Sequence, residues 1–177
     1  MPDVHALLRD LAADPRRQLL AVRTAGRERV DDPAVVAAIA RLLGSREVSP
    51  RDASWALALH EPIAPAAAET LVALAATDDA VVDAVVGLIA AGSAGNWSFP
   101  QASFDQGGYI GEYGGEDVRP AVLACRVAQA VAARRPDVRP RLAAALAGVR
   151  NDADARVRDE ATRTAKAIDA MGGEAGA

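Results

Sequence analysis

The stretch that decides the fold is Asp-Pro-Ala-Val-Val-Ala-Ala-Ile-Ala-Arg-Leu-Leu, residues 32–43. It aligns without gaps with Asp-Asp-Ala-Val-Val-Asp-Ala-Val-Val-Gly-Leu-Ile, residues 78–89. In both copies the larger apolar residues fall at positions i, i+1, i+4, i+7 and i+8, which form one stripe along an α-helix. Each copy begins with an aspartate suited to cap the first helical turn, Asp32 or Asp78. The sequence therefore predicts two equivalent helices, repeated along the chain.

Helical patterns extend over most of the remaining sequence. In the C-terminal half three further amphipathic runs each start at an aspartate, Asp117, Asp137 and Asp154. The other predicted helices occupy residues 3–13, 15–29, 50–60 and 65–76, and residues 172–177 are expected to form a flexible tail. No segment shows the clear alternation of apolar and polar residues that is typical of a strand. The pattern predicts a single all-α domain over residues 1–177.

The best repeat signature lies at the last of these aspartates. Asp154, Val157, Arg158 and Ala161 follow the spacing Asp-x-x-Val-Arg-x-x-Ala, which resembles the HEAT-like helical repeats. The resemblance implies a right-handed α-solenoid of antiparallel helix pairs, a fold that serves mostly as a binding scaffold and only occasionally as an enzyme. Enzymes with this architecture include DNA glycosylases for alkylated bases and bilin lyases.

Composition narrows the possible partners. Twenty Lys and Arg against twenty-four Asp and Glu give a net charge of −4, and the arginines are scattered along the chain, so no concentrated basic patch for nucleic acid is expected. One cysteine, Cys125, excludes an intramolecular disulfide, and two distant histidines give no support for a metal site. No cofactor motif is present. The N-terminus lacks a signal-peptide pattern and no apolar run is long enough for a membrane span, so we expect a cytoplasmic protein.

The segment from Ser93 to Asp117 breaks the helical pattern. It contains five of the six aromatic residues and several glycines, and its acidic residues are unopposed by any Lys or Arg. Long irregular connections in compact domains are usually functional or disordered, and disordered segments are poor in aromatics. We therefore expect one long, ordered, inserted loop. Its formal charge equals that of the whole chain, which favours a cationic partner.

The aromatic residues of this loop allow two interpretations. Trp97, Phe99 and Phe104 could fold back and pack against the helices, because the remaining core is built from small aliphatic residues. Tyr109 and Tyr113 lie among glycines and acids, where contact with a ligand or partner is as reasonable as packing. Outside the loop, Trp55 is expected in the core.

Two functions are consistent with these features. In the first, the protein is a binding or scaffold module that presents the loop and an adjacent helix face to a protein or small cationic ligand, with contacts from Asp105, Tyr109, Glu112, Tyr113 and Trp97. In the second, it is a small-molecule enzyme in which Asp105 and Glu112 divide the roles of acid and base, a tyrosine orients the substrate, and the loop acts as a lid. No known catalytic signature supports the second function, so the first leads.

Single residues elsewhere are weaker candidates for chemistry. His60 precedes Glu61, and a histidine beside a carboxylate is suited to general-base catalysis, although the end of a helix explains the same histidine. Cys125 lies in an apolar helical run without an adjacent base, which is typical of a buried core cysteine.

Overall fold

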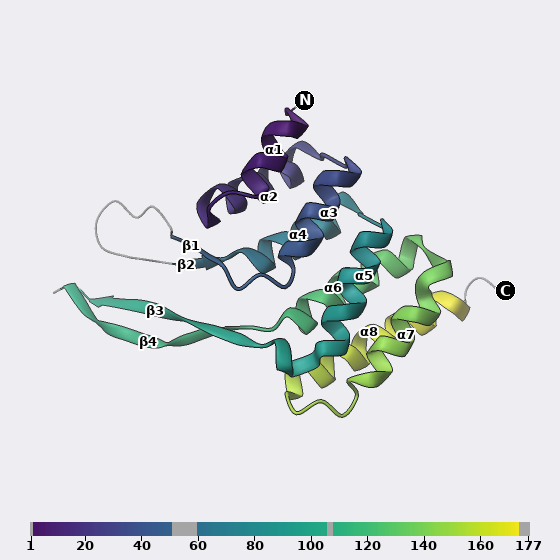
Figure 1. Ribbon diagram of the computed structural model, residues 1–177. Coiled ribbons are helices and arrows are strands. Elements are labelled where there is room, and N and C mark those ends of the chain that lie inside the picture. The colour runs from purple at the N-terminus through teal and green to yellow at the C-terminus, as the bar shows by residue number, and fades with distance from the viewer. Residues whose placement is uncertain (1, 51–59, 106–107, 174–177) are drawn as a thin grey trace.

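The computed structural model describes residues 2–50, 60–105 and 108–173. Its elements follow one another in a mainly helical order, with two short 3₁₀ turns, η1 and η2, and two ribbons of paired strands (Figure 1). The α-helices are α1 (Val4–Leu11), α2 (Pro15–Glu28), α3 (Pro33–Leu42), α4 (Ile63–Leu74), α5 (Asp79–Ala91), α6 (Pro120–Arg134), α7 (Arg139–Gly148) and α8 (Ala155–Gly173). The strands are β1 (Val48–Pro50), β2 (His60–Pro62), β3 (Trp97–Asp105) and β4 (Gly108–Val118), and the 3₁₀ turns are η1 (Gly92–Gly95) and η2 (Pro136–Val138).

The helices pack as two rows. Helices α1, α3, α5 and α7 each contact the next member of their own row, and α2, α4, α6 and α8 do the same. Consecutive helices also pack as pairs, α1 with α2, α3 with α4, α5 with α6 and α7 with α8. We call the row of α2, α4, α6 and α8 the second row. The mainly helical fold predicted from the sequence is confirmed.

The two aligned sequence copies occupy equivalent places, since α3 and α5 are the first helices of the second and third pairs. Their caps differ. The Asp32 side chain accepts hydrogen bonds from the backbone N–H groups of Ala34 (2.9 Å) and Val35 (3.2 Å), as predicted. Asp78 stands at the same position before α5 but makes no hydrogen bond that caps the helix. The repeat is therefore carried by the apolar stripe, not by the cap.

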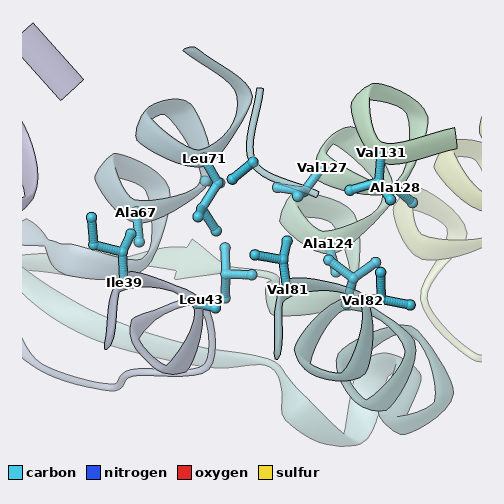
Figure 2. Packing of buried hydrophobic residues seen from close by; sticks show 14 of the residues in the cluster. Ile39, Leu43, Ala67, Leu71, Val81, Val82, Ala124, Val127, Ala128 and Val131 are labelled. Atoms are coloured by element: carbon cyan, nitrogen blue, oxygen red, sulfur yellow. The ribbon is translucent and has the colours of Figure 1, made fainter. Parts of the chain in front are cut away.

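The stripe residues form the core between the pairs. Figure 2 shows Ile39 and Leu43 from the α3 copy facing Leu71 of α4, with Val81 of α5 beside them. All four are at most 1% exposed. Much of the rest of this core is alanine, which lets helix backbones approach closely at no cost in side-chain entropy. Burial of each larger aliphatic side chain stabilises the fold by about 1.5–3 kcal/mol.

The turns between successive pairs repeat as well. Arg29 after α2 and Ala75 after α4 both adopt the left-handed conformation, with φ of 54° and 57°. In each turn the next residue donates a backbone hydrogen bond to the helix carbonyl five positions earlier, from Val30 to Ala25 and from Ala76 to Leu71. This is the Schellman arrangement that closes a helix C-terminus. The first two pairs thus end with the same backbone geometry.

The sequence predicted no strands, and this prediction is wrong. The predicted loop of residues 93–117 is largely an antiparallel hairpin of β3 and β4, and β1 pairs with β2 in a second ribbon. The alternation of apolar and polar residues is interrupted here, because Pro100 and the glycines of β4 are atypical of strands. The register also shifts twice, between Phe99 and Gln101 and between Ser103 and Phe104. The loop is thus mostly ordered secondary structure.

Two other predictions fall partly outside the described residues. For the helix expected over residues 50–60, Pro50 and His60 belong to strands, while residues 51–59, including Trp55, lie outside the described part. At the C-terminus α8 extends to Gly173, so the first two residues of the expected tail are helical. Residues 174–177 lie outside the described part.

Candidate functional site

The β3–β4 hairpin, which we call the arm, is the main feature outside the helical rows. It joins α5 to α6 and extends away from the helices (Figure 1). The β1–β2 ribbon joins α3 to α4, which is the equivalent place in the preceding helix pair. Both ribbons therefore leave the helical body at the same edge, and they lie near each other there.

The root of the arm is fixed by apolar packing. Phe99 and Val118, on opposite strands, are 5% and 4% exposed and pack with the buried Ala64 of α4. The Trp97 ring lies against Phe99, with centroids 5.7 Å apart and an angle of 45° between the planes. Val48 of β1 and Leu123 of α6 complete this small cluster. Trp97 and Phe99 therefore act as anchors, as the packing interpretation expected. The side chain of Phe104 lies outside the described part.

A polar network fixes the same root to the turn before α8. Asp154 Oδ2 accepts hydrogen bonds from Asn96 Nδ2 (2.9 Å) and Arg119 Nε (2.7 Å), and Arg119 also donates to Asp117 (2.9 Å). The Arg119 hydrogen bond holds the pKa of Asp154 below its usual value, against the opposing effect of burial. The network joins residues from three separate places in the sequence, and its Asp154 carboxylate stays charged at neutral pH.

Gly92 and Asp152 form the adjoining contact. Asp152 Oδ2 accepts a hydrogen bond from the Ser93 N–H (2.9 Å), while its other oxygen accepts one from the Asp154 N–H (2.8 Å). Gly92 ends α5 with φ of 55°, and a Cβ built there would lie 2.2 Å from Asp152 Oδ2. Only glycine suits both the backbone conformation and the space. The direction in which the chain enters the arm thus depends on this position.

The expected helix caps at Asp117 and Asp137 are wrong. Asp117 is a residue of β4, and α6 begins only at Pro120, so the Asp117 carboxylate pairs with Arg119 instead. The neighbouring Glu116 also belongs to β4. Asp137 lies in η2 and pairs with Arg135 at 2.7 Å. In contrast, Asp154 accepts from the Arg156 N–H (2.8 Å) at the start of α8, as expected of a cap.

The predicted binding residues lie at different positions along the arm. Asp105 pairs with Gly108 and Tyr109 with Phe104, so both lie next to the tip. Glu112 and Tyr113 lie further along β4, opposite Ala102 and Gln101. Trp97 is at the root, about 26 Å from Asp105 at about 3.3 Å per strand residue.

Thus the arm brings four of the five predicted residues onto one stretch of ribbon and separates Trp97 from them. The side chains of residues 100–116 lie outside the described part. Their contacts with a ligand remain a prediction.

A polar pocket lies beside the root. It has a volume of about 300 Å³, and Asn96, Trp97 and Arg119 are among the residues that line it. Within the described residues, Asn96 Oδ1 and Trp97 Nε1 are buried without a hydrogen-bond partner. This leaves one acceptor and one donor for water or for a polar group of a bound partner.

A second surface feature was not found from the sequence, a groove between α4 and α6. We call it the α4–α6 groove. Its main part, about 370 Å³, has apolar walls that include Pro65, Val72 and Leu123. A smaller part of about 230 Å³ shares Pro65 and Leu123 and continues to the root of the arm. Arg126 lines both parts and Arg156 the smaller one, and both arginines are exposed.

The sequence did contain one signal for this groove. Glu69 is the only charged residue of α4, so the helix has more apolar surface than the core requires. The outcome is visible in Val72, which is 41% exposed.

Of the weaker chemical candidates, Cys125 has a structural explanation, and the side chain of His60 lies outside the described part. Cys125 is fully buried in α6, and burial raises the pKa of its thiol to about 12, so it stays protonated at neutral pH. His60 starts β2 and does not end a helix, and Glu61 pairs with Arg23 of α2. Among the residues whose side chains the structure describes, no three of the His, Cys, Asp and Glu residues cluster closely enough to hold a metal ion. None of the helices described combines the length and apolarity needed to cross a lipid bilayer.

Comparison of the chain with protein-family models, with curated proteins and with solved structures finds no match.

Proposed function

We propose that this protein is a binding module, a HEAT-like right-handed α-solenoid that presents its arm to a protein partner carrying positive charge. The helix packing supports the solenoid part of the proposal. Four pairs stack so that each helix contacts its counterpart in the next pair, and the first two pairs end in the same turn geometry. This is the nearest-neighbour arrangement typical of helical repeats.

One observation carries the binding function: the arm is fixed at its root, and further out none of the other described strands pairs with it. Phe99 and Val118 pack on the helices, and the Arg119–Asp154 network fixes the same end. Among the described strands, β3 and β4 pair only with each other, so both edges of the ribbon are open. Open strand edges are templates for association, and a two-stranded ribbon alone is only marginally stable in water.

The charge of the arm selects the kind of partner. Asp105, Glu112, Glu116 and Asp117 are its only charged residues. Arg119 forms an ion pair with Asp117. The other three acids have no basic residue beside them in the sequence of the arm. Acidic groups beside aromatic residues attract Lys and Arg by Coulomb and cation–π interactions. A basic protein surface therefore suits the arm.

An extended shape favours a protein over a small ligand. Small-molecule sites are usually concave, whereas the arm is a ribbon of nine and eleven residues in β3 and β4. At about 3.3 Å per residue it extends about 30 Å from its root. Ribbons of this length bind along a surface, and their backbone groups contribute hydrogen bonds that small ligands do not match.

The test is a titration with a short poly-arginine peptide, followed by the NMR shifts of backbone amides and by calorimetry. We expect shifts in β3 and β4, with little change in the helices. Replacement of two arm acids, Asp105→Asn with Glu112→Gln, should weaken binding about 2- to 30-fold, because each exposed charge contributes about 0.2–1 kcal/mol. A matched control removes two acids elsewhere, Asp31→Asn with Asp169→Asn, and should change the affinity by less than about twofold.

Two results would contradict this function. One is equal weakening by the arm variant and the control, since the peptide would then respond only to net charge. The other is a set of shifts spread over the helices with none in the arm. A poly-glutamate peptide should give no arm shifts at all.

A further inference from the structure

We infer that the α4–α6 groove binds a medium-chain fatty acid, with the acyl chain along the apolar part of the groove and the carboxylate between Arg126 and Arg156 at the root of the arm. The groove is separate from the outer arm, so this inference goes beyond the proposed function and does not depend on it. The residues that line both parts of the groove have side chains that the structure describes.

The apolar part of the groove is suited to an alkyl chain. Its walls include Pro65, Ala68, Val72 and Ala73 of α4 and Leu123 of α6. Among the described residues Val72 is one of two large hydrophobic side chains that are exposed. Apolar surface in a concave site is stabilised when a ligand removes it from water, and mostly apolar walls are typical of small-molecule sites.

The dimensions of the groove suit a chain of about eight to ten carbons. Pro65 and Val72 are about 10 Å apart along α4, at about 1.5 Å per residue. An extended alkyl chain of about nine carbons has the same length, since each C–C bond of about 1.5 Å advances it by about 1.3 Å. The two parts of the groove, about 370 Å³ and about 230 Å³, are together of the usual size for a small-molecule site.

The root part of the groove supplies positive charge for a head group. Arg126 of α6 and Arg156 of α8 both line it and are exposed, and neither forms an ion pair with another of the described residues. Guanidinium groups bind carboxylates through short, charge-assisted hydrogen bonds. A carboxylate in this part can therefore be bound from two helices at once.

The acids near the root set the charge that the head group should carry. Asp117 lines the root part, but Arg119 donates to Asp117 at 2.9 Å and to Asp154 at 2.7 Å. Arg119 and its two acids have one positive and two negative charges, and the two other arginines, Arg126 and Arg156, leave the whole group with one positive charge. A single carboxylate neutralises this charge, whereas a dianionic phosphate exceeds it.

Glu69 sets the direction of the ligand. It lines the apolar part of the groove but not the root part, whereas Arg156 lines only the root part. Glu69 lies three residues before Val72 on α4, so the two side chains are neighbours on the helix surface. A carboxylate at the Val72 end would be repelled by Glu69. The methyl end of the chain therefore lies near Val72.

The test is calorimetric titration of the full chain with decanoate, below its micelle concentration and at neutral pH. The wild type should bind one decanoate per chain, with NMR shifts of backbone amides in α4, α6 and the start of α8. Octanoate should bind about 3- to 15-fold more weakly, because a fully buried methylene contributes about a factor of four. Decylammonium has the same chain and the opposite charge, and should bind at least about tenfold more weakly than decanoate.

A matched pair of variants tests the chain position. Val72→Glu places a charge beside the acyl chain and should raise the Kd for decanoate about tenfold or more. Leu20→Glu is the control, because Leu20 is the other exposed large hydrophobic residue and lies on α2. It should change the Kd by less than about twofold.

A second pair tests the head group. Arg126→Gln with Arg156→Gln should raise the Kd about 4- to 25-fold, because each charge-assisted pair at a partly covered site contributes about a factor of two to five. The control, Arg41→Gln with Arg150→Gln, changes two exposed arginines outside the groove and should alter the Kd by less than about twofold. Circular dichroism and thermal unfolding show whether each variant keeps its helices.

The comparison of ligands on the wild type does not depend on the folding of any variant. Absence of decanoate binding, or decylammonium binding as tight as that of decanoate, would overturn the inference. Tighter binding of decyl phosphate than of decanoate would also contradict it, because the head group would then not be a single carboxylate. Equal weakening by Val72→Glu and Leu20→Glu would place the chain elsewhere. None of these substitutions changes the arm, so the poly-arginine titration tests the proposed function separately.

Discussion

The helical rows and the arm differ in how they are packed. Every helix has neighbours in its pair and in its row, and the core between them is filled by side chains such as Leu43 and Leu146 that are fully buried. Among the side chains that the structure describes, the arm contacts the helical body at its root, through one small apolar cluster and one polar network. The packing described is therefore concentrated in the rows, and so is the stability that it provides. Substitutions in the two regions should have different kinds of effect.

The largest expected effect is the loss of a core side chain from the rows. Leu43→Ala removes a fully buried side chain between α3, α4 and α5 and should lower the free energy of unfolding by about 2–5 kcal/mol. Denaturant unfolding followed by circular dichroism measures it. Leu20→Ala is the control, because Leu20 is 63% exposed, and should change stability by at most about 0.5 kcal/mol. Equal losses for both would show that the rows are not the packed core described above.

An intermediate effect is expected where the rows meet the arm. Gly92→Ala places a Cβ against Asp152 and forces alanine into a conformation with φ of 55°, so it should cost about 1–3 kcal/mol. Gly87→Ala, in the middle of α5 with open space around it, should instead stabilise by about 0.5–1 kcal/mol. Thermal unfolding of the pair checks the opposite signs. A neutral Gly92→Ala would mean that the Asp152 contact does not fix the arm.

The smallest effect on global stability, and the most local one, is expected at Asp154. Its folded-state pKa is lowered, chiefly by the Arg119 hydrogen bond. The contribution of Asp154 to stability is therefore complete above the unfolded-state pKa near 4, and it is lost as pH falls through the lower folded-state pKa. Amide hydrogen exchange at Trp97, Phe99 and Val118 should therefore lose protection as the solution is acidified below about pH 4. Asp154→Asn should lower this protection already at pH 7, by about 1–2 kcal/mol.

That change should leave the exchange of amides deep in α3 and α5 nearly as in the wild type. Uniform loss of protection through the helices would show that the arm and the rows unfold as one unit. Such a result would remove the distinction drawn between them.

Each region could be predicted from the sequence to the extent that its interactions are between residues close together in the chain. The apolar stripes at 32–43 and 78–89 are local signals with a period of 3.6 residues, and both helices are present. The arm depends on pairing between strands whose pattern is interrupted by Pro100 and by two register shifts. No local period survives there, so the strands were missed although the segment itself was recognised.

The functional surfaces were predicted only in part, for a similar reason. Proximity in sequence suggested that Trp97 and Asp105 share one site, but an extended strand separates them by about 26 Å. The α4–α6 groove joins Val72 to Arg126, which are far apart in the chain, and the root network joins Arg119 to Asp154. Such contacts depend on the stacking of the pairs. Composition did identify the acidic charge and the aromatic content of the arm.

The position of the two ribbons has a consequence for how such a protein diversifies. Both are inserted inside a helix pair, between α3 and α4 and between α5 and α6, so neither interrupts the contacts from one pair to the next. The chain enters and leaves the arm side by side, at Trp97 and Val118. Hairpins of other lengths and sequences should therefore be exchangeable beyond Phe99 and Glu116, which makes this body a carrier on which new specificities can be grafted without redesign of its core.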